Sequence, residues 1–160
     1  MLRRLFLGFG SNLGCKKENI LNAYAEIEKR IGKIISRSAF YITNPEGFES
    51  ENYFLNSACE VECKIDIYSA FAETQFIEKQ IGRTSKSKNG IYSDRIIDID
   101  ILLADDLIID TPELTIPHPL LHKRRFVLEP LAEIAPDYIH PIFHKTILQL
   151  LSELDKQCTT

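Results

Sequence analysis

The sequence contains little that would place it in a membrane or outside the cell. It has no run of about 18 apolar residues, the length that a membrane-spanning helix requires. The basic pair Arg3-Arg4 precedes only a three-residue apolar run, residues 5–7, before Gly8, which is far too short for the core of a signal peptide. We therefore expect a cytoplasmic protein.

An excess of charge of either sign is also missing. The 160 residues carry a formal net charge of −4, which argues against a protein that binds nucleic acid through a general basic surface. With 44% hydrophobic and 26% charged residues, the composition is that of a folded globular protein and not of a disordered one. A chain of this length buries enough surface to fold by itself, so we expect a single domain over residues 1–160.

The usual zinc-binding motifs are absent as well. The four cysteines, at positions 15, 59, 63 and 158, form no C-x-x-C pair, which favours core or free thiols. His118 and His122 are four residues apart, but the prolines on both sides of His118 interrupt the helix that a two-histidine site would use. A structural zinc site is not expected.

Two common nucleotide motifs are missing. Gly8, Gly10 and Gly14 suggest a dinucleotide-binding turn, but leucine occupies position 13, where G-x-G-x-x-G requires its third glycine. No G-x-x-x-x-G-K-[ST] occurs, so the chain is not a P-loop kinase. Any ATP site must therefore use another design.

What the sequence does contain is an ordered series of periodic segments. Apolar spacing predicts strands over residues 4–9, 33–41, 54–63 and 96–103, the last forming a hairpin with 107–109, and helices over 18–31, 68–81, 120–135 and 146–155. Two polar loops, 43–52 and 83–95, are longer than plain connections. The order βαββαβ predicts an α+β, ferredoxin-like antiparallel sheet with covering helices and a C-terminal helical extension. Because that fold supports many functions, function must come from particular residues.

The sharpest chemical feature is the pair Asp98 and Asp100 inside an apolar strand. Residues two apart on a strand point to the same face, with Cα atoms about 7 Å apart. Two neighbouring buried carboxylates repel each other unless cations compensate them, and two Mg²⁺ ions would do so while gripping a polyphosphate. The alternative is a solvated strand face with salt bridges to Arg95 or a lysine, which the apolar neighbours make less favourable.

Two further segments could complete a site. Loop 83–95 carries arginines and lysines and leads directly into the aspartate strand, so it could fold over phosphates, although a charged loop by itself is usually only solvated. Residues 43–47, with Phe54 and Asn56 on one strand face, could line a pocket for a flat polar ring, because an aromatic ring stacks and an amide pairs with the ring's edge. Core packing is the alternative for Phe54.

In their order and spacing these segments closely resemble the 6-hydroxymethyl-7,8-dihydropterin pyrophosphokinase family over nearly the whole chain. The matching segments are 10–14, 40–45, 54–56, 78–83, 95–102, 114–118 and 124–126. The resemblance implies a ferredoxin-like enzyme of folate biosynthesis. Such an enzyme transfers the pyrophosphoryl group of ATP, its co-substrate, to the pterin hydroxymethyl group and releases AMP.

The resemblance also implies roles for individual residues. Asp98 and Asp100 fall on the two Mg²⁺ ligands, and Arg83 and Arg95 on catalytic loop arginines. Pterin-contacting positions are Thr43, Pro45, Phe54, Asn56, Tyr92 and Phe126, with the pterin between the rings of Phe54 and Phe126. ATP-site positions are Gln75, Glu78, Ile101, Thr115, His118 and Arg124.

Two rival classes share this fold. A regulatory or binding module would hold a small molecule without reacting on it, and its site would lack a buried acid pair. An RNA-binding domain would need more sheet aromatics than Phe54 and Phe126, and the acids at 98 and 100 oppose a phosphate backbone. We therefore expect small-molecule substrates as partners, and neither nucleic acid nor membrane. A single-site enzyme of this size has no need of a partner subunit, so we also expect a monomer.

Overall fold

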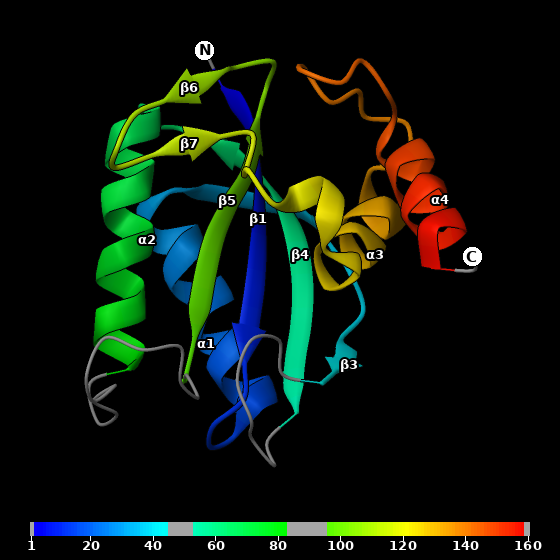
Figure 1. Ribbon diagram of the computed structural model, residues 1–160. Coiled ribbons are helices and arrows are strands. Elements are labelled where there is room, and N and C mark those ends of the chain that lie inside the picture. Colours follow the sequence, from blue (N-terminus) through cyan, green and yellow to red (C-terminus); the bar gives the residue numbers. More distant parts are fainter. Residues whose placement is uncertain (1, 45–52, 83–95, 159–160) are drawn as a thin grey trace.

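The computed structural model describes residues 2–44, 53–82 and 96–158 (Figure 1). Four predicted site residues, Pro45, Arg83, Tyr92 and Arg95, lie outside these ranges. The elements are β1 (Arg3–Ser11), α1 (Lys16–Arg30), β2 (Gly32–Arg37), β3 (Tyr41–Thr43), β4 (Phe54–Cys63), α2 (Ile67–Ile81), β5 (Asp98–Ala104), β6 (Ile109–Asp110), β7 (Thr115–Ile116), the 3₁₀ turn η2 (Leu121–Lys123), α3 (Arg125–Ile134) and α4 (Ile147–Cys158).

The main sheet has the order β2-β4-β1-β5, and all its pairs are antiparallel. This is the ferredoxin-like arrangement that the element order predicts. The single strand expected over 33–41 is wrong in one respect, because β2 ends at Arg37 and β3 begins at Tyr41. At the break, the Ser38 hydroxyl accepts the N–H of Ala58 at 2.9 Å, so a side chain takes over part of the strand pairing. β3 then resumes the pairing with β4.

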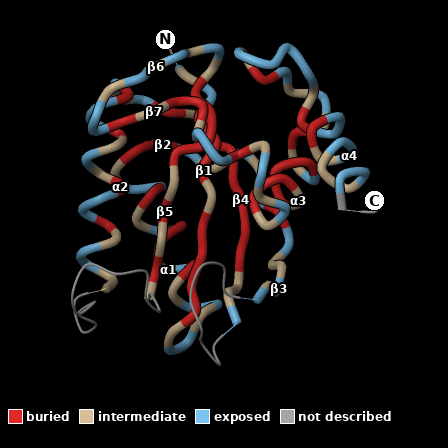
Figure 2. Tube along the Cα trace, viewed as in Figure 1, coloured by how far each residue is buried: buried red, intermediate tan, exposed pale blue. Residues whose placement is uncertain are grey.

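Helices cover both faces of the sheet (Figure 1). Alternate residues of β1 face opposite sides: Leu5 and Leu7 pack in the cluster with α1 and α2, whereas Phe6 packs in the cluster with α3 and α4. The central strands are consequently buried along much of their length (Figure 2). Among the described residues, no helix has the length and apolar character that crossing a membrane requires.

A β-bulge in β5 decides which way its side chains point. Phe6 pairs with Leu103 and Leu7 with Ile101, so Leu102 is an extra residue on β5. Leu102 and Leu103 therefore both pack towards α3, as bulges allow. Before the bulge, the strand alternates regularly, and Asp98 and Asp100 share the α3 side of the sheet with Gly8 and Gly10.

Two sequence expectations for the second half of the chain are corrected. β6 does not pair with β5 but with β7, because the turn at Asp105, which has a left-handed φ of 48°, leads the chain away from β5. The helix expected over 120–135 is divided into η2 and α3. Arg124, between them, has extended backbone angles (φ −117°, ψ 109°). This break turns the chain at the edge of a pocket.

Candidate active site

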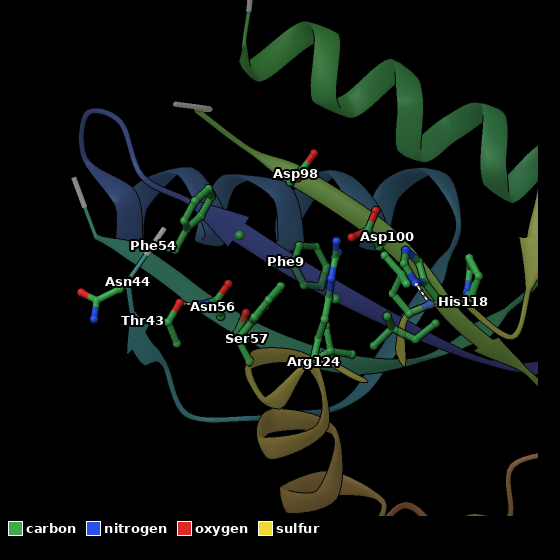
Figure 3. Close-up of a pocket in the computed structure, with 17 residues that line it drawn as sticks. Phe9, Thr43, Asn44, Phe54, Asn56, Ser57, Asp98, Asp100, His118 and Arg124 are labelled. Carbon is green, nitrogen blue, oxygen red and sulfur yellow. Dashed lines mark hydrogen bonds between the residues drawn. The ribbon is translucent and has the colours of Figure 1, made fainter. Parts of the chain in front are cut away.

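A pocket of about 440 Å³ lies over the α3 side of the sheet (Figure 3). It brings together eight predicted site residues that the sequence places far apart: Thr43, Phe54, Asn56, Asp98, Asp100, His118, Arg124 and Phe126. They come from β3, β4, β5, the segment that leads into α3 and the first turn of α3. One concave site therefore contains acidic, cationic, amide and aromatic groups.

The floor of this pocket is the backbone of β1 at Gly8 and Gly10. A Cβ atom on Gly10 would lie 3.3 Å from the Asn56 Oδ1 and 3.5 Å from the ring of Phe54. A Cβ on Gly8 would lie 3.3 Å from the side chain of Leu102. These glycines, whose spacing fails as a dinucleotide motif, keep the floor open. The sequence signal that could have identified them is their spacing of two, which matches the spacing of Asp98 and Asp100 on the strand that pairs with β1.

At one end, the half-buried Asp98 and Asp100 line the pocket from β5 (Figure 3). Mg²⁺ prefers oxygen ligands and is commonly held by one or two carboxylates, with waters and substrate phosphates completing its shell. Within the described ranges, no group of three or more Asp, Glu, His and Cys side chains forms a complete metal cage. The donor set thus fits Mg²⁺ that is shared with a phosphate-bearing ligand.

His118 and Arg124 lie close to the carboxylates. Burial lowers the pKa of His118 below its usual 6.5, the Arg124 charge lowers it further, and Asp98 acts in the opposite direction. His118 Nδ1 accepts the N–H of Leu120 at 3.2 Å, so the neutral ring carries its proton on Nε2. This end of the pocket therefore offers a guanidinium and an imidazole N–H near two carboxylates, a set suited to bound phosphate.

The other end of the pocket is lined by amide and aromatic side chains. The buried Asn56 donates from Nδ2 to the Thr43 hydroxyl at 2.6 Å, and Thr43 pairs with Phe54 across β3 and β4. Phe54 is half-buried and lines the pocket. Phe126 lines it from the start of α3, with the guanidinium of Arg124 5.4 Å from its ring centroid. Because β1 separates β4 from β5, the two ends lie two strand spacings apart, about 10 Å.

Four predicted ATP-site residues do not line the described pocket. Glu78 accepts the N–H of Ile99, between the two aspartates, at 2.7 Å. Gln75 is exposed on α2, Thr115 pairs with Asp110, and the Ile101 side chain is buried in the cluster with α1 and α2. Their assignment to ATP stays a prediction.

The fold is ferredoxin-like, and the described pocket lies on the α3 side of its sheet. Residues 6–136 match the model of the family described as 7,8-dihydro-6-hydroxymethylpterin-pyrophosphokinase (HPPK). The chain belongs to this family. Its function is pyrophosphoryl transfer from ATP to hydroxymethyl-dihydropterin in folate synthesis.

Individual relatives agree with this assignment. The chain is 41% identical over 138 residues to a 2-amino-4-hydroxy-6-hydroxymethyldihydropteridine pyrophosphokinase of Porphyromonas gingivalis, covering 86% of this chain and 93% of the relative. It is 37% identical over 149 residues to the enzyme of the same name from Aquifex aeolicus, covering 93% and 91%.

Larger relatives contain this unit as a part. "Folic acid synthesis protein FOL1" of Dictyostelium discoideum is 42% identical over 142 residues, which is 89% of this chain but only 21% of that protein. The crystal structure of wild-type HPPK-DHPS from Plasmodium falciparum matches with a TM-score of 0.79 at 19% identity, covering 98% of this chain and 45% of that one. At this identity the structural match shows the fold alone, which agrees with the prediction.

Proposed function

We propose that the transfer takes place in the described pocket, with the ATP phosphates at the Asp98 and Asp100 end and the pterin between Phe54 and Phe126. The observation that supports this most directly is the separation of the two ends. Carboxylates on β5 and ring-binding groups on β4 flank a glycine floor and lie about 10 Å apart. A flat heterocycle with a one-carbon arm can therefore present its hydroxyl group to a phosphate chain bound at the other end.

Asp98 and Asp100 would hold two Mg²⁺ ions by their carboxylate oxygens. When bound, Mg²⁺ would neutralise phosphate charge and lower the pKa of the attacking hydroxyl. Arg124 and the Nε2–H of His118 would bind phosphate oxygens at the same end. Positioning and electrostatic stabilisation then supply most of the rate, as in other phosphoryl transfers.

The remaining predicted residues complete the proposal. Arg83 and Arg95 would bind the phosphates, and Pro45 and Tyr92 the pterin, from segments outside the described ranges. Gln75, Glu78, Ile101 and Thr115 would act on the ATP side. We further propose that residues 1–160 form a single domain that works as a monomer in the cytoplasm.

The decisive experiment measures AMP formation from ATP and hydroxymethyl-dihydropterin with Mg²⁺, for the wild type, Asp98→Asn and Asp100→Asn. The amides keep the shape of the carboxylates but remove the charge that holds the cation. We expect each variant to lose roughly 100-fold or more of the turnover. Asp106→Asn, an exposed aspartate in the turn after β5, is the control and should react normally.

Two results would contradict the proposal. Near-normal turnover in both aspartate variants would remove the metal pair from the mechanism. Ligand binding by the wild type without AMP formation would instead indicate a binding module.

A further inference from the structure

β3, which carries Thr43, is too short to hold its place by strand pairing alone. It consists of three residues, Tyr41, Ile42 and Thr43, paired with Asn56, Leu55 and Phe54 of β4. Strands of this length gain little from backbone pairing. Ile42 is 74% exposed, so its side chain does not anchor the strand. The position of Thr43 in the pocket must therefore depend on other contacts.

The carboxylate of Glu133, near the end of α3, supplies such contacts. Its Oε1 accepts the Tyr41 hydroxyl proton at 2.5 Å, and its two oxygens accept the Ala39 N–H at 3.1 and 3.0 Å. Hydrogen bonds to an ionised carboxylate are stronger than those between neutral groups. One side chain of α3 thus binds the chain on both sides of residue 40, immediately before and within β3. We call these bonds the Glu133 tether.

The same two elements carry groups of the pocket. On β3, Tyr41 and Thr43 are two residues apart and share one strand face. On α3, Phe126 and Glu133 are seven residues apart, about two turns, and lie on the same side of the helix. Thr43 and Phe126 both line the pocket, at the end that lies over β4. The Glu133 tether therefore joins the two elements whose separation sets the width of that end.

We propose that Glu133 and Tyr41 are positioning residues for the pterin subsite, which hold β3 against α3. Neither residue lines the pocket. Without the tether, Thr43 can move away from Asn56 and from the ring of Phe126, so ring binding weakens. The inference rests on the proposed function, because that proposal places the pterin at this end of the pocket.

The test compares steady-state kinetics of Tyr41→Phe, Glu133→Ala and Glu133→Gln in the full chain. We expect Tyr41→Phe and Glu133→Ala to raise the KM for the pterin roughly three- to ten-fold, the effect of losing about one hydrogen bond. The KM for ATP should change by less than about two-fold, since the phosphate end is held by β5. Glu133→Gln should restore most of the pterin KM, because its amide oxygen still accepts from Tyr41 and Ala39, through weaker bonds than the carboxylate makes.

A double variant sharpens the test. If the hydroxyl of Tyr41 acts only through Glu133, Tyr41→Phe combined with Glu133→Ala should be no worse than Glu133→Ala alone. The matched control is Glu153→Ala on α4. It removes a hydrogen bond of 2.8 Å from Lys145 Nζ, which is exposed to solvent like the bonds of the Glu133 tether. It should change neither KM, and thermal unfolding checks that every variant is folded.

The outcomes separate this inference from the proposed function. A wild type that forms no AMP, or active Asp98→Asn and Asp100→Asn variants, contradicts the proposed function. An active wild type whose pterin KM is unchanged in Tyr41→Phe and Glu133→Ala overturns the positioning role. Equal changes in both KM values, or a Glu133→Gln variant as impaired as Glu133→Ala, also overturn it, since these results indicate general destabilisation or a charge effect.

Discussion

Gly10 of β1 lies directly opposite Asp98 of β5 in the antiparallel sheet. Two residues along, Gly8 lies opposite Asp100 in the same way. Each carboxylate therefore stands beside a position without a side chain, on the face that lines the pocket. The ligand space of the pocket follows from this pairing of a glycine strand with an acidic strand.

We predict that Gly10→Ala weakens pterin binding while the protein still folds. The new Cβ would lie 3.3 Å from the Asn56 Oδ1 and 3.5 Å from the Phe54 ring, so both proposed ring-binding side chains must shift. We expect the KM for the pterin to rise roughly ten-fold, as the cost of overpacking suggests. Steady-state kinetics with the pterin as the varied substrate measure the effect.

Gly8→Ala is the comparison for this variant. Its Cβ would lie 3.3 Å from Leu102, which packs in the cluster with α3 and α4. Its nearest contacts include neither Asn56 nor Phe54. It should lower the melting temperature more than it raises the pterin KM. Equal effects of both alanines on the pterin KM would count against the assigned position of the ring.

We predict that Glu78 supports the aspartate strand. β5 is an outer strand of the described sheet, and the N–H of Ile99, between Asp98 and Asp100, donates to a carboxylate oxygen of Glu78. Glu78→Ala removes this acceptor, so we expect a loss of turnover of roughly ten-fold and a higher Mg²⁺ requirement. Glu78→Gln keeps an acceptor oxygen and should be milder, whereas equal loss in both variants would indicate that the charge matters. Turnover measured against Mg²⁺ concentration distinguishes these cases.

We predict that His140 makes the folded protein less stable in acid. The residue is 2% exposed, and its Nδ1 accepts the N–H groups of Ile142 and Phe143 at 3.2 Å. Burial first, and then the charges of His122 and His144, lower its pKa from 6.5 to about 4. Between these values the unfolded chain holds a proton that the folded chain lacks, so the free energy of unfolding should fall as the pH falls, by up to about 1.4 kcal/mol per pH unit.

Denaturant unfolding between pH 4 and 7 measures this slope for wild type and His140→Asn, whose Oδ1 can accept the same two N–H groups. The difference between the two slopes should correspond to the uptake of about one proton on unfolding, which is about 1.4 kcal/mol per pH unit. His144→Asn is the comparison: this histidine is exposed, and its φ of 58° is a conformation that asparagine accepts. The variant removes one of the smaller causes of the His140 shift but leaves its burial, the first cause, so it should keep most of the wild-type slope. Identical slopes for wild type and His140→Asn would show that this imidazole does not titrate as described.

We predict that the pKa of the Tyr41 phenol is raised, and that its hydrogen bond to Glu133 is the main cause. The hydrogen bond to Glu133 first, and then burial, raise the Tyr41 pKa from 10.0 to about 12. Tyrosinate absorbance, measured as wild type minus Tyr41→Phe, should show this pKa. The same measurement in the Glu133→Ala background, as Glu133→Ala minus the double variant, should give a Tyr41 pKa closer to 10. If the Tyr41 pKa is the same in both backgrounds, the bond to Glu133 is absent in solution.

Much of this protein can be predicted from local patterns. The period-two spacing placed Asp98 and Asp100 on one strand face, and the order of periodic segments predicted the ferredoxin-like sheet. The mistakes occur where contacts between distant segments compete with local preference. The residues at 120–124 have helical spacing, but η2 ends and Arg124 becomes extended where the chain packs beside the pocket.

The sequence by itself determined most of the elements and their order, the shared face of Asp98 and Asp100, and the family to which the chain belongs. Those properties depend on neighbours along the chain, so spacing and matching segments contain them. Only the tertiary structure decided that Gly10 lies opposite Asp98, that the Leu102 bulge directs two leucines to one side, and that Glu133 binds Tyr41, 92 residues away. Such contacts arise when whole elements pack against one another, and the periodicity of one element does not specify the register of its partner.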